Sequence, residues 1–484
     1  MRNPRVIQQL SARLSAGNVV TDTHALTPFE TDGLTAIRQK PWVVALPETV
    51  EQVRAALRIC REHGVPVVTR GAGTGLSGGA RPLSEGVLLT LTKMTRILEV
   101  DAPACAARVE PGVPNAKITE AAAPFGLYYA PDPSSQIACS IGGNVAENSG
   151  GVHCLKYGLT LNNVLGMTVQ TFEGDELVLG GRTLDAPGYD LMATMVGSEG
   201  MLGVVTEVVV KLLPEPFAKR VLLAAFDDVR RAGEAVAAII RVGVIPAGLE
   251  MMDALAINAA EDYAHAGYPR DAAAILLCEL DGNEEEVRAD VEIVRGVLDR
   301  AGAVEVRIAS DEAERETLWR GRKAAFPAAG RLAPDYYCMD GTIPRRELGS
   351  VLTEIGALSE RFGLPVANVF HAGDGNLHPL ILYDSSQPGE LEKAEEFGGE
   401  ILKLCVARGG TVTGEHGVGV EKLDAMCAQF TDAELDQFHR LKAAFDPAGL
   451  MNPGKAIPTL ARCSELGGMH VRGGALPHSE LERF

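Results

Sequence analysis

The chain has 484 residues, about three times the length of a typical domain, so at least two domains are expected. Hydrophobic residues make up 46% and charged residues 23% of the chain, which is typical of an ordered globular protein and excludes a disordered one. The formal net charge of −19 argues against a nucleic-acid partner, because so negative a surface repels phosphate backbones. A small anionic substrate stays possible, since one Arg or a metal ion can reverse the field inside a pocket.

Neither a membrane span nor a signal peptide is expected. No apolar run approaches the ~18 residues that a span requires, and the polar N-terminal stretch lacks the apolar centre of a signal peptide. We therefore expect a cytoplasmic protein. Its nine scattered cysteines, without a Cys-x-x-Cys pair, are expected to be reduced core thiols. They do not form the close group that an iron–sulfur cluster needs, so any electrons must pass to another molecule.

The first part of the chain reads as short elements joined by glycine-rich loops. Residues 1–33 are expected to form a leading helix and a polar connector. A strand–helix–strand unit follows, with apolar strands at residues 42–46 and 65–69. Thr49 with Gln52 three residues later is a capping-box signature, so the intervening helix is expected to begin there.

A Pro-Glu-Pro sequence at residues 214–216 marks the expected domain boundary. Before it, residues 204–210 form the clearest strand. After it, longer amphipathic helices alternate with strands, a pattern that favours an α+β fold in which helices cover a sheet. The expected helices are residues 229–242, 284–301 and 350–361, and the expected strands are residues 273–279 and 304–308.

The first glycine-rich loop is Arg-Gly-Ala-Gly-Thr-Gly-Leu-Ser-Gly-Gly at residues 70–79. It contains the G-x-G-x-x-G pattern of Rossmann dinucleotide sites, but that pattern must open a helix, and here a strand-like run at residues 87–91 follows. A Rossmann-type NAD site is therefore disfavoured. Successive backbone N–H groups can still cradle a phosphate, and a simple turn does not require so many glycines, each with an entropic cost.

Two further loops have a similar character. Residues 131–151 are read as a loop rich in small and hydroxyl-bearing residues, which suits close backbone approach to a large flat ligand. Residues 197–203 run directly into the strand at residues 204–210. Each loop alone is weak evidence. Three of them in one domain, all tied to strands, predict one extended nucleotide cofactor.

The three loops resemble the flavin-binding domain of the vanillyl-alcohol-oxidase superfamily. The resemblance implies non-covalent FAD, because no covalent attachment residue maps onto this sequence, in a cleft between two small α+β subdomains. It implies a PCMH-type FAD-binding domain over residues 34–216 and an α+β substrate domain with a C-terminal tail over residues 217–484. The implied FAD-contacting positions are Arg70, Gly71, Gly73, Thr74, Gly75, Ser77, Gly78, Pro131, Asp132, Ser135, Gly142, Gly143, Asn144, Glu199, Gly200, Gly203, Val204 and Asn452.

Histidines and carboxylates gather in two segments of the second half, His-Ala-Gly-Asp-Gly-Asn-Leu-His and Gly-Glu-His-Gly. They contain His371, His378, Glu415 and His416. Two histidines and one carboxylate are a common ligand set for Zn²⁺ or Mn²⁺ with open positions. The Gly-Asp-Gly between the first two histidines suggests a turn that brings their rings together. On the residues alone, a metal site and ordinary core or surface histidines both stay open.

Both segments resemble motifs of FAD-linked D-2-hydroxy-acid dehydrogenases. In that family the positions matching His371, His378 and Glu415 bind a divalent metal, and the position matching His416 is the base beside the substrate. A Leu-Trp-x-x-Arg motif ends here at Arg322, whose family counterpart binds the substrate carboxylate, a role that suits a planar guanidinium. Standing alone, this Arg would read as a solvated charge on a helix. The implied reaction moves a hydride from the substrate to the flavin and a hydroxyl proton to the base.

The resemblance extends over nearly the whole chain and is strongest for the glycolate-oxidising branch of the family. The 2-hydroxyglutarate branch has a Lys where Cys338 stands and an Asn where Leu380 stands, so a smaller pocket with one carboxylate to bind is implied. We expect oxidation of glycolate to glyoxylate, with D-lactate as a second substrate because one methyl group changes discrimination by only about 1–3 kcal/mol. A D-lactate dehydrogenase of the same family is the alternative.

The same branch implies an assembly with a second flavin-type subunit and an iron–sulfur subunit, and quinone as the downstream acceptor. Through these partners the protein is expected at the inner face of the plasma membrane. The tail at residues 462–484 is either a docking segment or a frayed terminus. Two readings from other classes stay open. A metal-dependent hydrolase leaves the glycine loops unexplained, and a non-catalytic FAD-binding subunit is expected to lack the histidine–carboxylate set.

Overall fold

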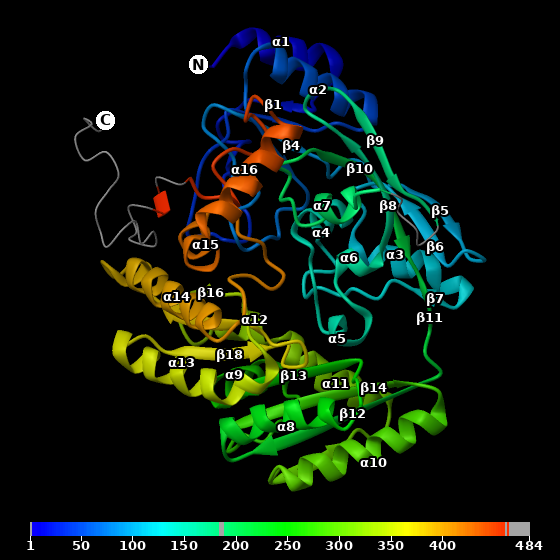
Figure 1. The fold of residues 1–484 in the computed structure, drawn as a ribbon, viewed down its shortest axis with the longest axis vertical. Coiled ribbons are helices and arrows are strands. Elements are labelled where there is room, and N and C mark those ends of the chain that lie inside the picture. The colour runs from blue at the N-terminus through cyan, green and yellow to red at the C-terminus, as the bar shows by residue number, and fades with distance from the viewer. Residues whose placement is uncertain (1, 183–187, 460–461, 464–484) are drawn as a thin grey trace.

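The computed structural model describes residues 2–182, 188–459 and 462–463 (Figure 1). The first half of the chain builds two small sheets, and the second half builds one large sheet with helices on both faces (Figure 1). Helices and strands alternate with the glycine-rich loops much as the sequence predicts. The α+β class expected from the sequence is therefore confirmed.

The first sheet has four strands in the order β1-β2-β4-β3. Its strands β2, β4 and β3 are parallel, and β1 is antiparallel to β2. The helices α1 and α2 cover it through one shared core, which contains Val6 and Leu57. The bounds are α1 (Pro4–Arg13), β1 (Val19–Val20), the 3-10 turn η1 (Thr27–Phe29), β2 (Val43–Ala45), α2 (Val50–Glu62), β3 (Val67–Arg70) and β4 (Val87–Thr90).

The predicted cap of α2 is present in altered form. Thr49 Oγ1 accepts a hydrogen bond from Gln52 N at 3.3 Å, as a capping box requires. The Gln52 side chain reaches one residue further back and accepts from Glu48 N at 2.7 Å instead of from Thr49 N. The helix nevertheless begins where the sequence places it, because the Thr side chain satisfies one of its free N–H groups.

The second sheet has five antiparallel strands in the order β5-β6-β10-β8-β9. The central strand β10 alternates buried and half-buried residues, which confirms the strand predicted at residues 204–210. Short helices and a two-stranded ladder of β7 and β11 surround it. The strands are β5 (Ile97–Asp101), β6 (Ala106–Val109), β7 (Leu127–Tyr128), β8 (Val164–Gln170), β9 (Glu176–Gly180), β10 (Val204–Lys211) and β11 (Leu213–Pro214). The helices are α3 (Asn115–Ala122), η2 (Ala123–Phe125), α4 (Ile141–Glu147), α5 (Cys154–Tyr157), α6 (Thr160–Asn163) and α7 (Leu191–Met195).

The second glycine-rich segment is not the continuous loop that the sequence predicts. Its central residues form the helix α4, which packs tightly against the loop at Pro111. A Cβ on Gly142 would lie 2.7 Å from Pro111 Cβ and 3.0 Å from its carbonyl oxygen. The prediction was wrong here because small residues were taken only as a sign of close ligand approach. In this helix they also permit close backbone packing.

The second half contains a seven-stranded sheet in the order β15-β12-β14-β13-β18-β20-β16, antiparallel throughout. Strand β14, the third in this order, is buried on both faces: Leu276 and Cys278 face one core, and Ile275 and Leu277 face the other. The strands are β12 (Ala218–Phe226), β13 (Gly248–Asp253), β14 (Ala274–Gly282), β15 (Glu305–Ile308), β16 (Asp335–Cys338), β18 (Val366–Phe370) and β20 (Pro379–Tyr383). A separate pair of short strands comprises β17 (Gly341–Thr342) and β19 (Asn376–Leu377).

Helices cover both faces of this sheet. One core joins it to α8, α10, α13 and α14, and the other joins it to α9, α11 and α12. The three predicted helices appear as α8, α10 and α13, with ends within two residues of the expected positions. The helices are α8 (Val229–Arg241), α9 (Ala254–Ala264), α10 (Glu284–Arg300), α11 (Glu312–Lys323), α12 (Ala325–Ala329), η3 (Arg345–Glu347), α13 (Leu348–Phe362) and α14 (Glu390–Ala407).

The chain returns to the first half after the large sheet is complete. Following α15 (Leu423–Gln429), helix α16 (Asp432–Phe445) lies beside the first sheet (Figure 1). Lys442 Nζ donates to the carbonyl of Met201 at 2.6 Å, and Asn452 N donates to the carbonyl of Val67 at 2.7 Å. The domain boundary predicted at residues 214–216 therefore does not separate the two halves completely. A C-terminal segment returns to pack on the first half, and the sequence does not reveal this return.

The expectation of nine reduced cysteines is wrong for two of them. Cys427 on α15 and Cys463 are joined by a disulfide across 36 residues. The other seven are free, and all except Cys105 are buried. The rest of the predicted tail, residues 464–484, lies outside the described residues. None of the helices that the structure describes is long and apolar enough to cross a bilayer.

Two glycines test how closely the helices of the second half pack. A Cβ on Gly233 of α8 would lie 2.7 Å from Gly349 N of α13, whereas one on Gly356 of α13 would meet no described atom within 4 Å. We expect Gly233→Ala to lower the free energy of unfolding by about 1–3 kcal/mol, because the two helices must separate. Gly356→Ala, the control, should raise it by up to about 1 kcal/mol, because Ala favours helix. Thermal melting measures both; equal midpoints would contradict the packing.

Candidate active site

One cavity of about 400 Å³ lies between the two halves of the chain. The three glycine-rich segments line it from the first half. From the second half, the lining includes Lys323, Phe326, Tyr336, His378, Glu415 and His416. Two regions that the sequence singled out for separate reasons, a nucleotide-type loop set and a histidine–carboxylate set, therefore face the same space.

Most of the predicted FAD-contacting positions line this cavity. They are Arg70, Gly71, Gly73, Thr74, Gly75, Ser135, Gly142, Gly143, Asn144, Glu199, Gly200, Gly203 and Val204. The glycine at position 73 is required by backbone geometry, since its φ is +76° and a Cβ would lie 2.1 Å from the Arg70 guanidinium. These residues offer the small side chains and free backbone that a large flat ligand needs.

Five predicted positions lie outside the lining of the cavity, within the part of the chain that the structure describes: Ser77, Gly78, Pro131, Asp132 and Asn452. Two of them support the glycine-rich segments. Asn452 Nδ2 donates to the carbonyls of Gly79 and Glu199 at 3.1 and 2.6 Å, and the Ser77 carbonyl accepts from Val420 N at 3.0 Å.

Asp132 has a different setting from the one expected. Its carboxylate lies 2.9 Å from His153 Nδ1, and His153 Nε2 lies 3.2 Å from Glu279 Oε1 in the large sheet. Burial acts to lower the pKa of His153, but the two carboxylates raise it to about 10. The histidine is therefore charged near neutral pH and joins the two halves of the chain.

His371, His378 and Glu415 come together: the turn brings the two histidines close, as the sequence predicts, and Glu415 is the carboxylate that the family resemblance implies. His371 Nε2 and His378 Nε2 lie 3.3 and 3.0 Å from Glu415 Oε1, and one donor atom from each residue lies within 4.8 Å of the others. Burial would raise the pKa of Glu415, but the two imidazoles hold it well below its usual range. The turn between the two histidines thus brings their rings close, with centroids 5.1 Å apart.

The donor set fits a divalent metal. The side chain of His378 is buried, and its Nδ1 makes no hydrogen bond to any described residue, while its Nε2 faces Glu415. His371 Nδ1 lies 2.8 Å from Glu250 Oε1, and its Nε2 lies 3.3 Å from Glu415 Oε1. The two carboxylates raise the pKa of His371 well above its usual range, so a metal ion bound at Nε2 would replace a proton held there. A carboxylate behind a ligating histidine is the usual outer partner in metal sites, because it fixes the tautomer and orients the ring.

Arg322 is placed differently from the substrate clamp that the resemblance implies. It is only 2% exposed, and it does not belong to the described lining of the cavity. Its NH2 group lies 2.6 Å from Glu250 Oε2, the carboxylate that also contacts His371. The adjacent Lys323 does line the cavity. Glu250 therefore couples Arg322 to the histidine–carboxylate set through one buried carboxylate.

A second buried carboxylate fixes the loop that carries Glu415 and His416. Asp340 accepts hydrogen bonds from the backbone N–H groups of Gly414, Glu415 and His416 at 2.9–3.1 Å. Lys422 Nζ lies 2.9 Å from its Oδ2, and both side chains are fully buried. Burial would raise the pKa of Asp340, but Lys422 and nearby imidazoles hold it well below its usual range.

The far end of the same loop is held from the first half. Glu199, in the third glycine-rich segment, accepts from Val418 N and Gly419 N at 2.7 Å each. Glu199 also stands in the left-handed region with φ of 50°, which is uncommon for a residue other than glycine. A carboxylate predicted to contact the cofactor therefore also anchors the loop of the second half that lines the same cavity.

His416 is half-buried at the junction of the two halves and lines the cavity. Burial lowers its pKa to about 4, against the opposing charge of Asp340. The imidazole is therefore neutral near pH 7 and has a lone pair available. Its ring stacks on His378 with centroids 4.9 Å apart. A neutral imidazole at this place is suited to accept a proton.

Three residues important to this arrangement were missed as site residues by sequence reasoning: Glu250, Asp340 and Lys422. They contact their partners across 121, 75 and 82 residues of chain, so local spacing carries no sign of them. The residue types themselves offered the one sign that these residues are paired and buried. Each is a charged residue beside apolar strand or helix residues, and buried charges are rare unless paired.

Comparisons with known proteins give the family. Residues 215–456 match the family described as FAD linked oxidases, C-terminal domain, and residues 41–180 match the FAD binding domain family. The chain belongs to the FAD-linked oxidase family. It is thus an FAD-dependent oxidoreductase, and the flavin-free hydrolase considered above is excluded.

Curated members of this family are similar over most of their length. The chain is 60% identical over 479 residues to the glycolate oxidase subunit GlcD of Escherichia coli strain K12, covering 99% of this chain and 96% of that protein. It is 40% identical over 435 residues to GlcD of Bacillus subtilis, covering 90% and 93%. A D-lactate dehydrogenase of Anaerostipes hadrus is 32% identical over 430 residues, covering 86% and 90%.

Solved structures confirm the fold. A structure of p-cresol methylhydroxylase with substrate bound has a TM-score of 0.80 at 20% identity, covering 95% of this chain and 97% of that one. 4-Ethylphenol oxidase from Gulosibacter chungangensis has a TM-score of 0.79 at 18% identity, covering 95% and 98%. The predicted PCMH-type FAD-binding fold is therefore confirmed.

The ion pair of Asp340 and Lys422 gives a test of how the loop is held. Asp340→Asn leaves a buried ammonium without its countercharge, so we expect the free energy of unfolding to fall by about 3–5 kcal/mol, measured by urea denaturation. Adding Lys422→Met removes the unpaired charge and should restore most of that loss. A double variant as unstable as Asp340→Asn alone would contradict the pairing.

Proposed function

We propose that this protein oxidises glycolate to glyoxylate, with D-lactate as a second substrate. The observation that carries the proposal is the single cavity lined by the FAD-binding loops and by His378, Glu415 and His416. A 2-hydroxy acid there would lie between a hydride acceptor and a group able to take its hydroxyl proton. The GlcD names of the relatives at 60% and 40% identity support glycolate.

The glycine-rich loops would hold FAD without a covalent bond, chiefly through the thirteen lining positions given above. Successive backbone N–H groups of residues 71–75 suit a pyrophosphate, and the small residues of α4 suit a flat ring system. When bound, FAD supplies the ring that accepts the hydride. The other five predicted positions stay predictions as cofactor contacts, and two of them, Ser77 and Asn452, also keep the loops in place.

His371, His378 and Glu415 would hold a divalent cation such as Zn²⁺ or Mn²⁺, since two imidazoles and one carboxylate leave coordination positions open for a substrate. Such an ion lowers the pKa of a coordinated hydroxyl group. Glu250 orients His371 for this role through its contact with Nδ1.

His416 would act as the base. It is neutral, faces the cavity, and is fixed at its backbone N–H by Asp340. A base must lie within hydrogen-bond reach of the proton it removes, and the loop geometry keeps this ring beside His378. The hydroxyl proton of the substrate would pass to this imidazole as the hydride leaves Cα.

Arg322 would orient the substrate carboxylate, as the family resemblance implies, and this role requires its guanidinium to reach past the cavity lining to which it does not belong in this structure. Its Nε makes no hydrogen bond within the described part of the chain, so the guanidinium keeps a free donor besides its contact with Glu250. Lys323 is the nearest alternative cation, because it lines the cavity directly. Cys338 pairs with Leu380 across β16 and β20, so neither position carries a charged or amide side chain for a second substrate carboxylate, which suits a small substrate with one carboxylate.

The curated D-lactate dehydrogenases among the relatives make preferential oxidation of D-lactate a second candidate. One methyl group distinguishes the two substrates, so the residue types present do not decide which one the protein prefers. The kcat/KM values of the two substrates decide it.

We also propose that the electrons leave through partner subunits: a second flavin-type subunit and an iron–sulfur subunit, with quinone as the final acceptor. The relative at 60% identity is named as a subunit, which supports an assembly. Seven free cysteines of the described chain are scattered, so they offer no cluster of their own. Through such partners the protein would lie in the cytoplasm at the inner face of the plasma membrane.

Three variants test these assignments. We expect His416→Ala to retain FAD but to slow flavin reduction by glycolate at least a hundredfold, the typical size of a general-base effect.

Arg322→Ala should raise KM for glycolate and D-lactate alike, with Lys323→Ala as the matched control. Stopped-flow absorbance and steady-state kinetics measure both effects. Wild-type reduction by the His416 variant would refute the base, and a raised KM only in the Lys323 variant would move the carboxylate contact to that residue.

Metal content tests the remaining part of the proposal. Active wild-type protein should contain one divalent ion per chain by elemental analysis, and His371→Ala should lose it. Active protein with no stoichiometric divalent ion would end the metal assignment while leaving the FAD assignment intact.

A further inference from the structure

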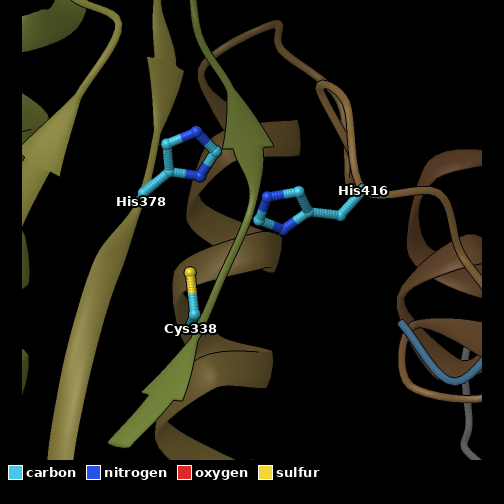
Figure 2. A group of neighbouring side chains, drawn as sticks. All are labelled: Cys338, His378 and His416. Carbon is cyan, nitrogen blue, oxygen red and sulfur yellow. The ribbon is translucent and has the colours of Figure 1, made fainter. Parts of the chain in front are cut away.

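A second group of metal-binding side chains adjoins the proposed metal site. Cys338, at the end of β16, lies beside His378, which stands between β19 and β20, and beside His416 of the 413–419 loop. Figure 2 shows the thiol and the two imidazole rings gathered around one small space. One donor atom from each residue lies within 4.8 Å of the other two.

The donor atoms of this group have few other partners. His378 Nδ1 and His416 Nδ1 are buried and make no hydrogen bond to any residue that the structure describes. The Cys338 thiol has a single weak contact, at 3.5 Å from the carbonyl of Met339. Buried polar atoms normally have hydrogen-bond partners, so unpartnered nitrogens beside a thiol leave a place where a ligand can bind favourably.

The chemistry of this set differs from that of the neighbouring one. His371, His378 and Glu415 offer two nitrogens and an oxygen, whereas Cys338, His378 and His416 offer a sulfur and two nitrogens. Thiolate favours soft cations, and carboxylate favours harder ones. The backbone N–H of His416 donates to Asp340, which holds the loop that carries this ligand in place.

We propose that Cys338, His378 and His416 form a second, inhibitory site for a soft divalent cation such as Cd²⁺ or Zn²⁺. On binding, the Sγ–H bond breaks, the proton leaves to solvent, and a sulfur–metal bond forms, with no change of oxidation state. The two imidazoles complete three protein ligands and leave a position for water.

The two sites compete because they share His378. A neutral imidazole has one lone pair for a metal, since its other nitrogen carries a proton. An ion held by Cys338 through this ring therefore removes one ligand from the His371–His378–Glu415 set. It also occupies the lone pair of His416. Inhibition rests on the function proposed above, whereas binding of the cation does not.

Cd²⁺ is the probe, because its bond to a thiolate gives an ultraviolet charge-transfer absorption that nitrogen and oxygen ligands do not give. The FAD-loaded full-length protein is compared with Cys338→Ala and with Cys278→Ala, which removes a free buried thiol from β14. Bound Cd²⁺ is measured by equilibrium dialysis and by this absorption. Flavin reduction by glycolate is followed separately, with and without Cd²⁺.

We expect the wild type and Cys278→Ala to show the thiolate absorption and to lose at least tenfold in flavin-reduction rate when Cd²⁺ is added. Cys338→Ala should lack the absorption and reduce its flavin at the same rate with and without Cd²⁺. An equal absorption in the Cys338 variant, or none in the wild type, would overturn the site. Equal inhibition of all three proteins would overturn its inhibitory role. Failure of glycolate to reduce any sample would reject the proposed function, while the absorption would still decide the site.

Discussion

The 413–419 loop is held at both ends by buried carboxylates, and the geometry of the site depends on this constraint. Asp340 of the second half accepts its first N–H groups, and Glu199 of the first half accepts those of Val418 and Gly419. Hydrogen bonds to ionised acceptors are stronger than neutral ones, and burial increases the cost of losing them. The loop therefore cannot move away from the glycine-rich segments without leaving buried charge unsatisfied, and His416 stays at the junction of the two halves.

Glu250 is another buried carboxylate that fixes side chains of the site, although it lies behind the cavity lining. It contacts Arg322 and His371 with its two oxygens, so one carboxylate compensates a guanidinium and orients an imidazole. Burial would raise the pKa of Glu250, but His371 and Arg322 lower it below its ordinary value. The site is thus built from alternating charges that are mostly buried.

Much of this arrangement follows from local sequence patterns. Helices such as α8 and α10 follow from apolar spacing, and the meeting of His371 with His378 follows from the Gly-Asp-Gly turn between them. Features that depend on contacts between residues far apart in the chain do not follow from local sequence patterns. The pairing of Arg322 with Glu250, the disulfide of Cys427 with Cys463, and the return of α16 to the first half all join residues far apart in the chain. The family resemblance gave candidate site residues, but not which of them line the cavity.

The account requires that the FAD-binding loops and the histidine–carboxylate set serve one reaction. The most direct test is an anaerobic titration of the purified FAD-loaded protein with glycolate, D-lactate and D-2-hydroxyglutarate while the flavin absorption is followed. The account predicts that glycolate bleaches the flavin in a one-to-one ratio, that D-lactate also bleaches it, and that the larger diacid does so far more slowly. A fully loaded flavin that none of the three acids reduces would contradict it.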